Sequence, residues 1–309
     1  MRTAWAACAV AAGLMTGGCS VRKFAVNQVG NALASGGSTY ESDDDVDLVG
    51  SALPFSLKLV ESLLAESPKH RGLLLTAASG FAQYGYAYVE EQADEAAAES
   101  LERSSALRAR ARRLYRRAFG YGMRGLDAAY PGIGAAIEND PAAALARVRR
   151  RDLPLLYWTS AAHGLAISAS KDDPEMIAQL PEVEAMVRRG EELDASWNSG
   201  ALPEFLMSIE SARVGVKADD LQQRMRQHYE RSLAQSGGRR ASVYVTYAEK
   251  AMVPAQNRVQ FKALLEKALA IDPDREPPAR LANLIAQRRA RWLLGRIDEL
   301  FLEPESSPQ

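Results

Sequence analysis

The chain has 309 residues, of which 47% are hydrophobic and 25% charged, a balance that is typical of folded globular proteins and excludes a disordered chain. Its formal net charge of -1 gives no bulk electrostatic attraction to nucleic acid, whose binding normally requires a concentrated basic face. We therefore expect a globular protein that has no nucleic-acid partner.

The N-terminus has the layout of a bacterial signal peptide, in which one basic residue precedes an apolar run too short to span a bilayer. Small residues then lead to Cys19 in a pattern that resembles the lipobox, where the cysteine thiol receives a diacylglycerol. We expect residues 1–18 to be cleaved off and Cys19 to be lipidated. The alternative is ordinary cleavage near the same place, which leaves a free thiol.

The lipid would hold the protein at a membrane, since several acyl chains give stable attachment. Ser20 follows the cysteine, and bacterial sorting rules then favour the periplasmic leaflet of the outer membrane. Residues 19–42 are expected to be a tether. The sequence thus predicts a lipid-anchored protein on the periplasmic side of a bacterial membrane.

An acidic run at residues 42–45 stands before the first long apolar segment, where carboxylates can cap free backbone N–H groups of a helix. The alternating Asp43, Asp45 and Asp47 also suggest a calcium loop. However, Leu48 and Pro54 occupy the positions where such a loop has glycine and glutamate. Capping is the favoured interpretation.

Residues 51–88 are predicted to form a helical hairpin around a Ser-Pro turn. Leu53, Leu57 and Val60 recur at helical spacing before the turn, and Ala77 and Phe81 recur after it. Neither helix can bury its apolar face alone, so we expect such hairpins to stack.

The rest of the chain continues this pattern, because its apolar stretches lack the period-two alternation of strands and are rich in good helix formers. Further helices are expected at about residues 106–129, 141–149, 155–170, 174–193, 203–214, 219–235, 242–252, 258–271 and 279–302. We predict an all-α domain at residues 43–302, followed by a frayed tail at 303–309.

The helix that ends at Ile271-Asp272-Pro273 resembles the second helix of a tetratricopeptide repeat. Weaker copies of this ending occur upstream at uneven separations. The expected architecture is therefore an array of degenerate tetratricopeptide-like hairpins that forms one compact or curved helical domain.

The sequence offers no catalytic motif. His70, His163 and His228 are far apart and have no metal-ligand spacing, and His163 is expected to be packed in an apolar helix. Residues 120–125 spell G-x-G-x-x-G, but no strand precedes them as in a dinucleotide site. We expect a protein that is not an enzyme and has no cofactor and no metal.

Two sets of side chains are candidate ligand contacts. The first is aromatic and stands beside glycines, so it could line an apolar cavity, although aromatic core packing is the commoner role. It consists of Phe81, Tyr84, Tyr88, Tyr157 and Trp158.

The second set is a polar stripe of Asn283, Gln287 and Arg291, spaced by four residues on one expected helix. Guanidinium groups match carboxylates, so the stripe could face an anion. The alternative is a solvated helix face.

Several segments together resemble the T-component lipoproteins of tripartite ATP-independent periplasmic (TRAP) transporters, and the similarity extends over residues 31–301. The segments are 42–45, 52–55, 59–68, 73–75, 78–81 with Tyr84, 155–158, 171–174, 236–242 and 283–292.

The resemblance implies a periplasmic helical protein that partners the substrate-binding protein of a TRAP system. It also implies a homo-oligomer that encloses an apolar path for small ligands, and it supplies no catalytic residues. Our hypothesis is a lipid-anchored adaptor that passes on a small organic-acid or hydrophobic ligand. The alternative is a structural envelope scaffold without a ligand.

Overall fold

The computed structural model describes residues 26–32, 37–170, 172–213 and 215–302, and in these ranges it contains helices and no strand, which confirms the all-α prediction. The α-helices in chain order are α2 (Gly37–Glu41), α3 (Val46–Glu66), α4 (Arg71–Tyr84), α5 (Glu91–Ala96), α6 (Leu101–Ala129), α7 (Ile133–Asn139), α8 (Pro141–Leu145), α9 (Leu153–Ser168), α10 (Pro174–Ile177), α11 (Leu180–Asp194), α12 (Ala201–Glu210), α13 (Ala218–Ser236), α14 (Ala241–Tyr247), α15 (Arg258–Leu269), α16 (Arg280–Gly295) and α17 (Ile297–Leu300). The π-helices are η1 (Gly85–Glu90) and η4 (Ala248–Met252), and the 3-10 helices are η2 (Arg150–Asp152), η3 (Trp197–Gly200), η5 (Pro273–Arg275) and η6 (Pro277–Ala279).

Parts of the predicted N- and C-terminal segments cannot be compared with this structure. The predicted signal peptide, Cys19 and the predicted tail at 303–309 lie outside the described residues. Within the predicted tether, residues 26–32 and α2 are helical.

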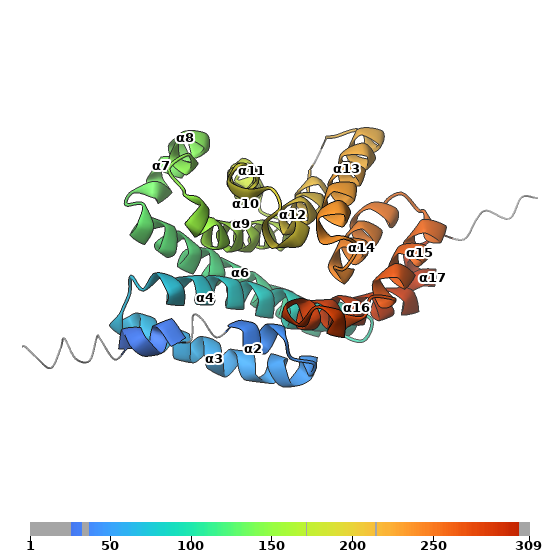
Figure 1. The fold of residues 1–309 in the computed structure, drawn as a ribbon. Helices are drawn as coiled ribbons and strands as arrows, with labels where there is room; N and C mark the ends of the chain where they lie inside the picture. Colours follow the sequence, from blue (N-terminus) through green and yellow to red (C-terminus); the bar gives the residue numbers. More distant parts are fainter. Residues whose placement is uncertain (1–25, 33–36, 171, 214, 303–309) are drawn as a thin grey trace, which may run out of the picture.

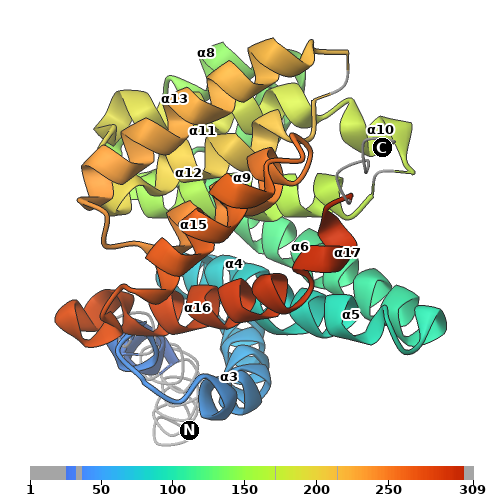
Figure 2. The ribbon, with the colours of Figure 1, turned by 90° about the vertical axis from the view of Figure 1, so that its right-hand side faces the viewer.

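The helices form one curved, compact body in which successive elements pack on each other (Figure 1). In the first half, α3 packs on α4, α4 on α6, α6 on α9 and α9 on α11. In the second half, α14, α15 and α16 contact one another. Helix α16 then returns to contact α2 and α3, so a late helix of the chain packs against early ones (Figure 2). The tetratricopeptide-like character of the hairpins stays a prediction.

The apolar core is divided between the two halves. One buried cluster, which includes Tyr247, Phe261 and Leu293, draws only on residues from Met207 to Phe301. The other clusters draw on residues up to Ile209. Burial of apolar surface therefore stabilises each half separately, and the seam between the halves is where polar side chains and open space can occur.

The start of α3 confirms the capping prediction. The Asp45 carboxylate accepts hydrogen bonds from the backbone N–H groups of Asp47 (3.1 Å) and Leu48 (2.8 Å). Two of the helix's free donors are thereby satisfied. Pro54 lies inside the same helix.

Helix α3 is the one helix of the described residues whose length and apolarity would suffice to cross a membrane. Its buried side chains Leu57, Val60 and Leu64 lie in the same apolar cluster as residues of α4.

Helices α6 and α9 approach closely because glycine stands at their contact. A Cβ atom on Gly122 would lie 2.3 Å from the Thr159 hydroxyl, and one on Gly125 would lie 2.9 Å from Leu155. The G-x-G-x-x-G string at 120–125 therefore lies inside α6, and two of its glycines allow α6 and α9 to pack closely.

Several helix boundaries differ from the predictions. The expected helix at 174–193 is two helices, because Pro181 lies in the first turn of α11, where it lacks an N–H to continue α10. Helices α5 and α7 were not predicted. The expected helices ending at residues 88 and 252 finish as π-helices. The sequence did not predict this, because apolar periodicity does not reveal one extra residue in a turn.

Candidate functional site

Two π-helices from distant parts of the chain line one cavity at the seam between the two cores. Tyr86 and Glu90 of η1 and Glu249 and Lys250 of η4 all line the same two chambers. Helix η1 also lies tightly against α6, because a Cβ atom on Gly85 would be 2.7 Å from the Tyr115 ring. Single π-turns occur frequently at functional sites, which makes this cavity the candidate site.

The cavity has three adjoining chambers with shared lining residues, and Tyr86 lines all three. The polar chamber has a volume of about 430 Å³ and lies between η1, α5, α6, η4 and α16. The aromatic chamber, of about 230 Å³, is lined by Tyr157, Trp158 and Phe205, among others. The third chamber, of about 250 Å³, lies against α16, and we call it the α16 chamber. Tyr86 has 51% of its surface exposed although it lies inside the molecule, because it borders this space.

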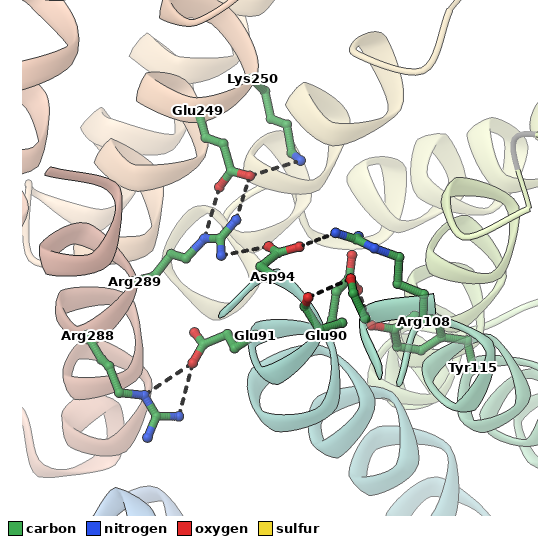
Figure 3. A network of polar contacts seen from close by, with 11 residues as sticks. Glu90, Glu91, Asp94, Arg108, Tyr115, Glu249, Lys250, Arg288 and Arg289 are labelled. Carbon is green, nitrogen blue, oxygen red and sulfur yellow. Dashed lines mark hydrogen bonds and ion pairs between the residues drawn. The ribbon is translucent and has the colours of Figure 1, made fainter. Parts of the chain in front are cut away.

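A network of ion pairs crosses the polar chamber (Figure 3). The Arg289 guanidinium contacts the Glu249 carboxylate at 3.0 Å and the Asp94 carboxylate at 2.7 Å. Asp94 is also 2.8 Å from the Arg108 guanidinium. One chain of charges thus joins η4, α16, α5 and α6.

The neighbouring Arg288 makes a second connection between α16 and the N-terminal half. Its guanidinium lies 3.0 Å from both the Glu91 and the Asp47 carboxylates and donates a hydrogen bond to the Ala87 carbonyl oxygen (3.2 Å). Burial of Glu91 raises its pKa to about 7, although the guanidinium groups of Arg288 and Arg289 lower it. Glu91 therefore titrates near neutral pH.

Glu90 is held by a single strong partner, since its carboxylate accepts a hydrogen bond from the Tyr115 hydroxyl. Burial raises the pKa of Glu90, and the hydrogen bond from Tyr115 opposes this effect. Tyr115 is itself completely buried, so this bond fixes η1 to α6.

Lys250 differs from the other cations in the cavity. Its ammonium lies 3.6 Å from the Glu249 carboxylate, which is longer than a hydrogen bond, and 40% of its side chain is exposed. Glu249 meanwhile has two closer contacts with Arg289, at 3.0 and 3.4 Å. Lys250 therefore keeps donors that can reach a ligand.

The aromatic chamber has a wall of packed rings. Tyr157 meets Trp158 edge-on at a centroid distance of 5.1 Å and lies 4.5 Å from Trp197 and 6.2 Å from Phe205. Burial raises the pKa of Tyr157 to about 12, so its hydroxyl stays neutral. At the edge of this wall, Arg240 donates two hydrogen bonds to Glu204, at 3.0 and 3.2 Å.

The structure separates the aromatic residues that the sequence selected. Tyr157 and Trp158 line the aromatic chamber, and Tyr88 and Trp158 line the α16 chamber. Phe81 is buried and stacks on Tyr121 at 5.9 Å. Tyr84 packs in the same core cluster as Phe81 and stacks on Tyr88 at 5.7 Å.

The polar stripe on α16 makes contacts other than those proposed for it. Asn283 accepts a hydrogen bond from the Ala241 N–H (2.9 Å) and donates one to the Arg239 carbonyl oxygen (3.1 Å). Gln287 donates to the carbonyl oxygens at the end of α15, the closest being Ile271 at 2.7 Å. Arg291 is exposed at the surface. Both amides are thus bonded to backbone groups that would otherwise be buried without partners.

Sequence reasoning missed the charged residues that line the cavity. These are Glu41, Glu90, Glu91, Asp94, Arg108, Asp172, Glu204, Arg240, Glu249, Lys250 and Arg289. A usable signal was present, since Glu90-Glu91 and Glu249-Lys250 each follow directly on an aromatic apolar run. A charge at the end of such a run indicates a polar feature inside the fold.

Among the described residues, no group of three or more His, Cys, Asp or Glu side chains is placed to hold a metal ion. His163 is buried, stacks on Phe119 at 4.1 Å and shares a hydrogen bond of 2.9 Å with Gln179. The cavity combines apolar walls with a small number of convergent charges, which is an arrangement suited to binding.

Comparison with known proteins supports the resemblance seen in the sequence. A family model described as the TRAP transporter T-component matches residues 42–301. A protein of Treponema pallidum (strain Nichols), described as uncharacterized, is 27% identical over 313 residues, and the alignment covers 96% of this chain and 97% of that protein.

Proposed function

Because the chain belongs to the TRAP transporter T-component family, we propose that it is the adaptor of a TRAP system and docks the substrate-binding protein of that system. Membership of the family associates the chain with TRAP transport, and the family is a transport component rather than an enzyme family. The docking role is our proposal, and the match over residues 42–301 is the observation that carries it.

We further propose that the protein is anchored through a lipid on Cys19 at the periplasmic side of a bacterial membrane, with the outer membrane favoured. The supporting feature is the signal-like N-terminus that ends at this cysteine. Such an anchor would keep the helical domain near the membrane that its transport partners occupy.

The internal cavity supports a second part of the proposal, in which the adaptor accepts and passes on a small organic-acid or hydrophobic ligand. Apolar and aromatic side chains enclose the aromatic chamber, and the polar chamber adjoins it through Tyr86, Glu249 and Lys250. Ligand sites generally combine such apolar walls with a few placed charges. We also propose that the protein forms a homo-oligomer, as the family resemblance implies. Sedimentation of the purified protein measures its oligomeric state.

Co-purification tests the proposal. The full-length tagged chain is expressed in its own cell envelope and recovered at several salt concentrations, and the substrate-binding protein of the TRAP system is sought by mass spectrometry. We expect that protein to be recovered. Its absence under every condition contradicts the docking role.

Native mass spectrometry of the same preparation separates the adaptor from a structural scaffold. A retained small molecule supports the ligand-passing role. A protein that binds its partner but never retains or binds a small molecule fits the scaffold instead.

A further inference from the structure

We propose that the cavity binds an amphipathic carboxylate, an organic acid with an apolar body, and that Lys250 binds the carboxylate head while the aromatic chamber holds the body. This rests on the proposed function, because it names the ligand class of the same cavity. In this proposal, Lys250 is the residue that makes the cavity prefer an anionic ligand.

The arginines that line the cavity are already matched by carboxylates. Arg289 contacts Glu249 and Asp94 at 3.0 and 2.7 Å, and Arg240 makes two hydrogen bonds to Glu204. Guanidinium groups held in this way have few donors left, and breaking such a partly buried pair would leave a charge uncompensated. A ligand anion therefore gains little from these arginines.

Lys250 is not matched in this way. Its contact with Glu249 is 3.6 Å long, and Arg289 holds Glu249 more closely than Lys250 does. A lysine ammonium has three donors, and a carboxylate is the group that best uses them in a space of low polarity. Arg108 also keeps free donors, but it lines only the polar chamber; among the described cations, Lys250 is the one that lines both the polar and the aromatic chamber.

A cationic ligand fits this cavity less well. The carboxylates of Asp94 and Glu249 are engaged by arginines, and that of Glu91 is engaged by Arg288 at 3.0 Å. Among the described residues no arginine is paired with Glu90, but its carboxylate is engaged by the Tyr115 hydroxyl. Asp172 also lines the polar chamber, but its side chain is 84% exposed and it does not line the aromatic chamber. At the boundary between the two chambers, the ligand charge that can still be compensated is therefore negative.

The apolar part of the ligand has a place beside Lys250. Lys250 lines both the polar and the aromatic chamber, so a head group at its ammonium lies at the boundary between them. From that boundary, the aromatic chamber continues along Leu165, Ile167 and Phe205. An unbranched or aromatic acid can therefore put its carboxylate at Lys250 and bury its body, which gains free energy in proportion to the apolar area removed from water.

Calorimetric titration with three probes that share one apolar chain tests this assignment. The full-length protein in lipid nanodiscs is titrated with decanoate, 1-decanol and decylamine, and empty nanodiscs serve as the blank. We expect decanoate to bind most tightly. Lys250→Met should weaken decanoate binding about tenfold or more, which is the value of one charge-assisted hydrogen bond, and should change 1-decanol binding less than about twofold.

Two control variants keep the test decisive. Lys250→Arg retains the positive charge and should bind decanoate within about threefold of the wild type. Lys262→Met removes a lysine that is 62% exposed and is absent from the cavity lining, so it should change nothing. Circular dichroism checks that each variant is folded.

The inference is overturned if decanoate does not bind, if Lys250→Met binds it as tightly as the wild type, or if decylamine binds more tightly than decanoate. These failures are distinct from failure of the docking role, since co-purification with the substrate-binding protein does not depend on Lys250. A chain that docks its partner but does not bind decanoate loses only the ligand assignment.

Discussion

Arg289 near the C-terminus lies 2.7 Å from the carboxylate of Asp94 in the N-terminal half, and the same guanidinium contacts Glu249 at 3.0 Å. The side chain of Arg289 is only 15% exposed, so these charges are poorly screened by water. The two halves have separate apolar cores, and Arg289 is one of the groups that connect them across the cavity. A polar contact thus contributes to holding the halves together at the cavity.

We predict that Arg289→Met destabilises the protein by about 3 kcal/mol, because it removes the closest partner of the half-buried Glu249 carboxylate and one of the two partners of Asp94. Guanidinium denaturation followed by circular dichroism measures the change. Hydrogen exchange should accelerate mainly in η1, α5 and η4. The matched control is Arg258→Met, whose partner Asp298 is 83% exposed, and it should cost less than about 1 kcal/mol. Equal losses in the two variants would contradict the closing role of Arg289.

Glu91 should make stability depend on pH near neutrality. Burial raises the pKa of Glu91 from 4.5 to about 7, so between these pH values the folded protein holds a proton that the unfolded chain has released. The stability from this proton is complete below about pH 4.5 and is lost as the pH rises through about 7. One pKa unit is worth about 1.4 kcal/mol, so the loss is at most about 3.5 kcal/mol.

The comparison of wild type with Glu91→Gln isolates this effect, because glutamine cannot ionise. The free energy of unfolding of the wild type, relative to that of the variant, should fall between pH 4.5 and pH 8. Glu95→Gln, at an exposed position of the same helix, should show no such trend. A difference that stays constant or increases with pH would show that Glu91 is not buried in this way.

Two glycines in the same helix should respond in opposite directions to alanine. In Gly122→Ala the new Cβ would lie 2.3 Å from the Thr159 hydroxyl and 3.1 Å from the Thr159 Cα, so α6 and α9 must separate. A loss of about 1 to 3 kcal/mol is expected. In Gly120→Ala the new Cβ meets nothing within 4 Å, and the variant should gain about 0.5 to 1 kcal/mol. Urea denaturation measures the free energy of unfolding of both variants. Losses of stability of similar size in the two would contradict the close contact of α6 with α9.

Asp152 should be the most sensitive acidic residue away from the cavity. Its side chain is 1% exposed and is bonded by the Tyr130 hydroxyl and the Arg71 guanidinium, so it joins α4, the end of α6 and the start of α9. We predict that Asp152→Ala costs about 3 kcal/mol in the free energy of unfolding. Asp298→Ala, at an exposed position, is the control and should cost less than about 1 kcal/mol. A neutral effect of Asp152→Ala would mean that this buried connection is dispensable.

The fold class could be predicted from the sequence because each long helix carries its own apolar face. Leu57, Val60 and Leu64 recur at helical spacing, and the structure buries all three in one cluster. The two π-helices could not be predicted in this way, since an extra residue in a turn leaves the apolar pattern almost unchanged. Asp45 was recognised as a cap because its partners lie within three residues of it.

The site was harder to predict, because its residues come from distant segments. Periodicity shows that a face such as that of Phe81 is buried, but not whether it meets a neighbouring helix or a cavity. Phe81 meets Tyr121, whereas Trp158 borders two chambers. The role of the Gln287 amide was equally hard to predict, because the carbonyl oxygens to which it donates hydrogen bonds lie at the end of another helix. Lys250 gave no signal beyond its place after an apolar run.

Sedimentation velocity of two purified proteins tests the central claim most directly. The full-length chain in detergent is mixed with the substrate-binding protein of the TRAP system from the same genome, at about 10 μM each and at low and physiological salt. We predict a single faster boundary that contains both proteins, since specific docking at this concentration requires only a dissociation constant of about 1 μM. Two boundaries that sediment independently under every condition would contradict the adaptor role.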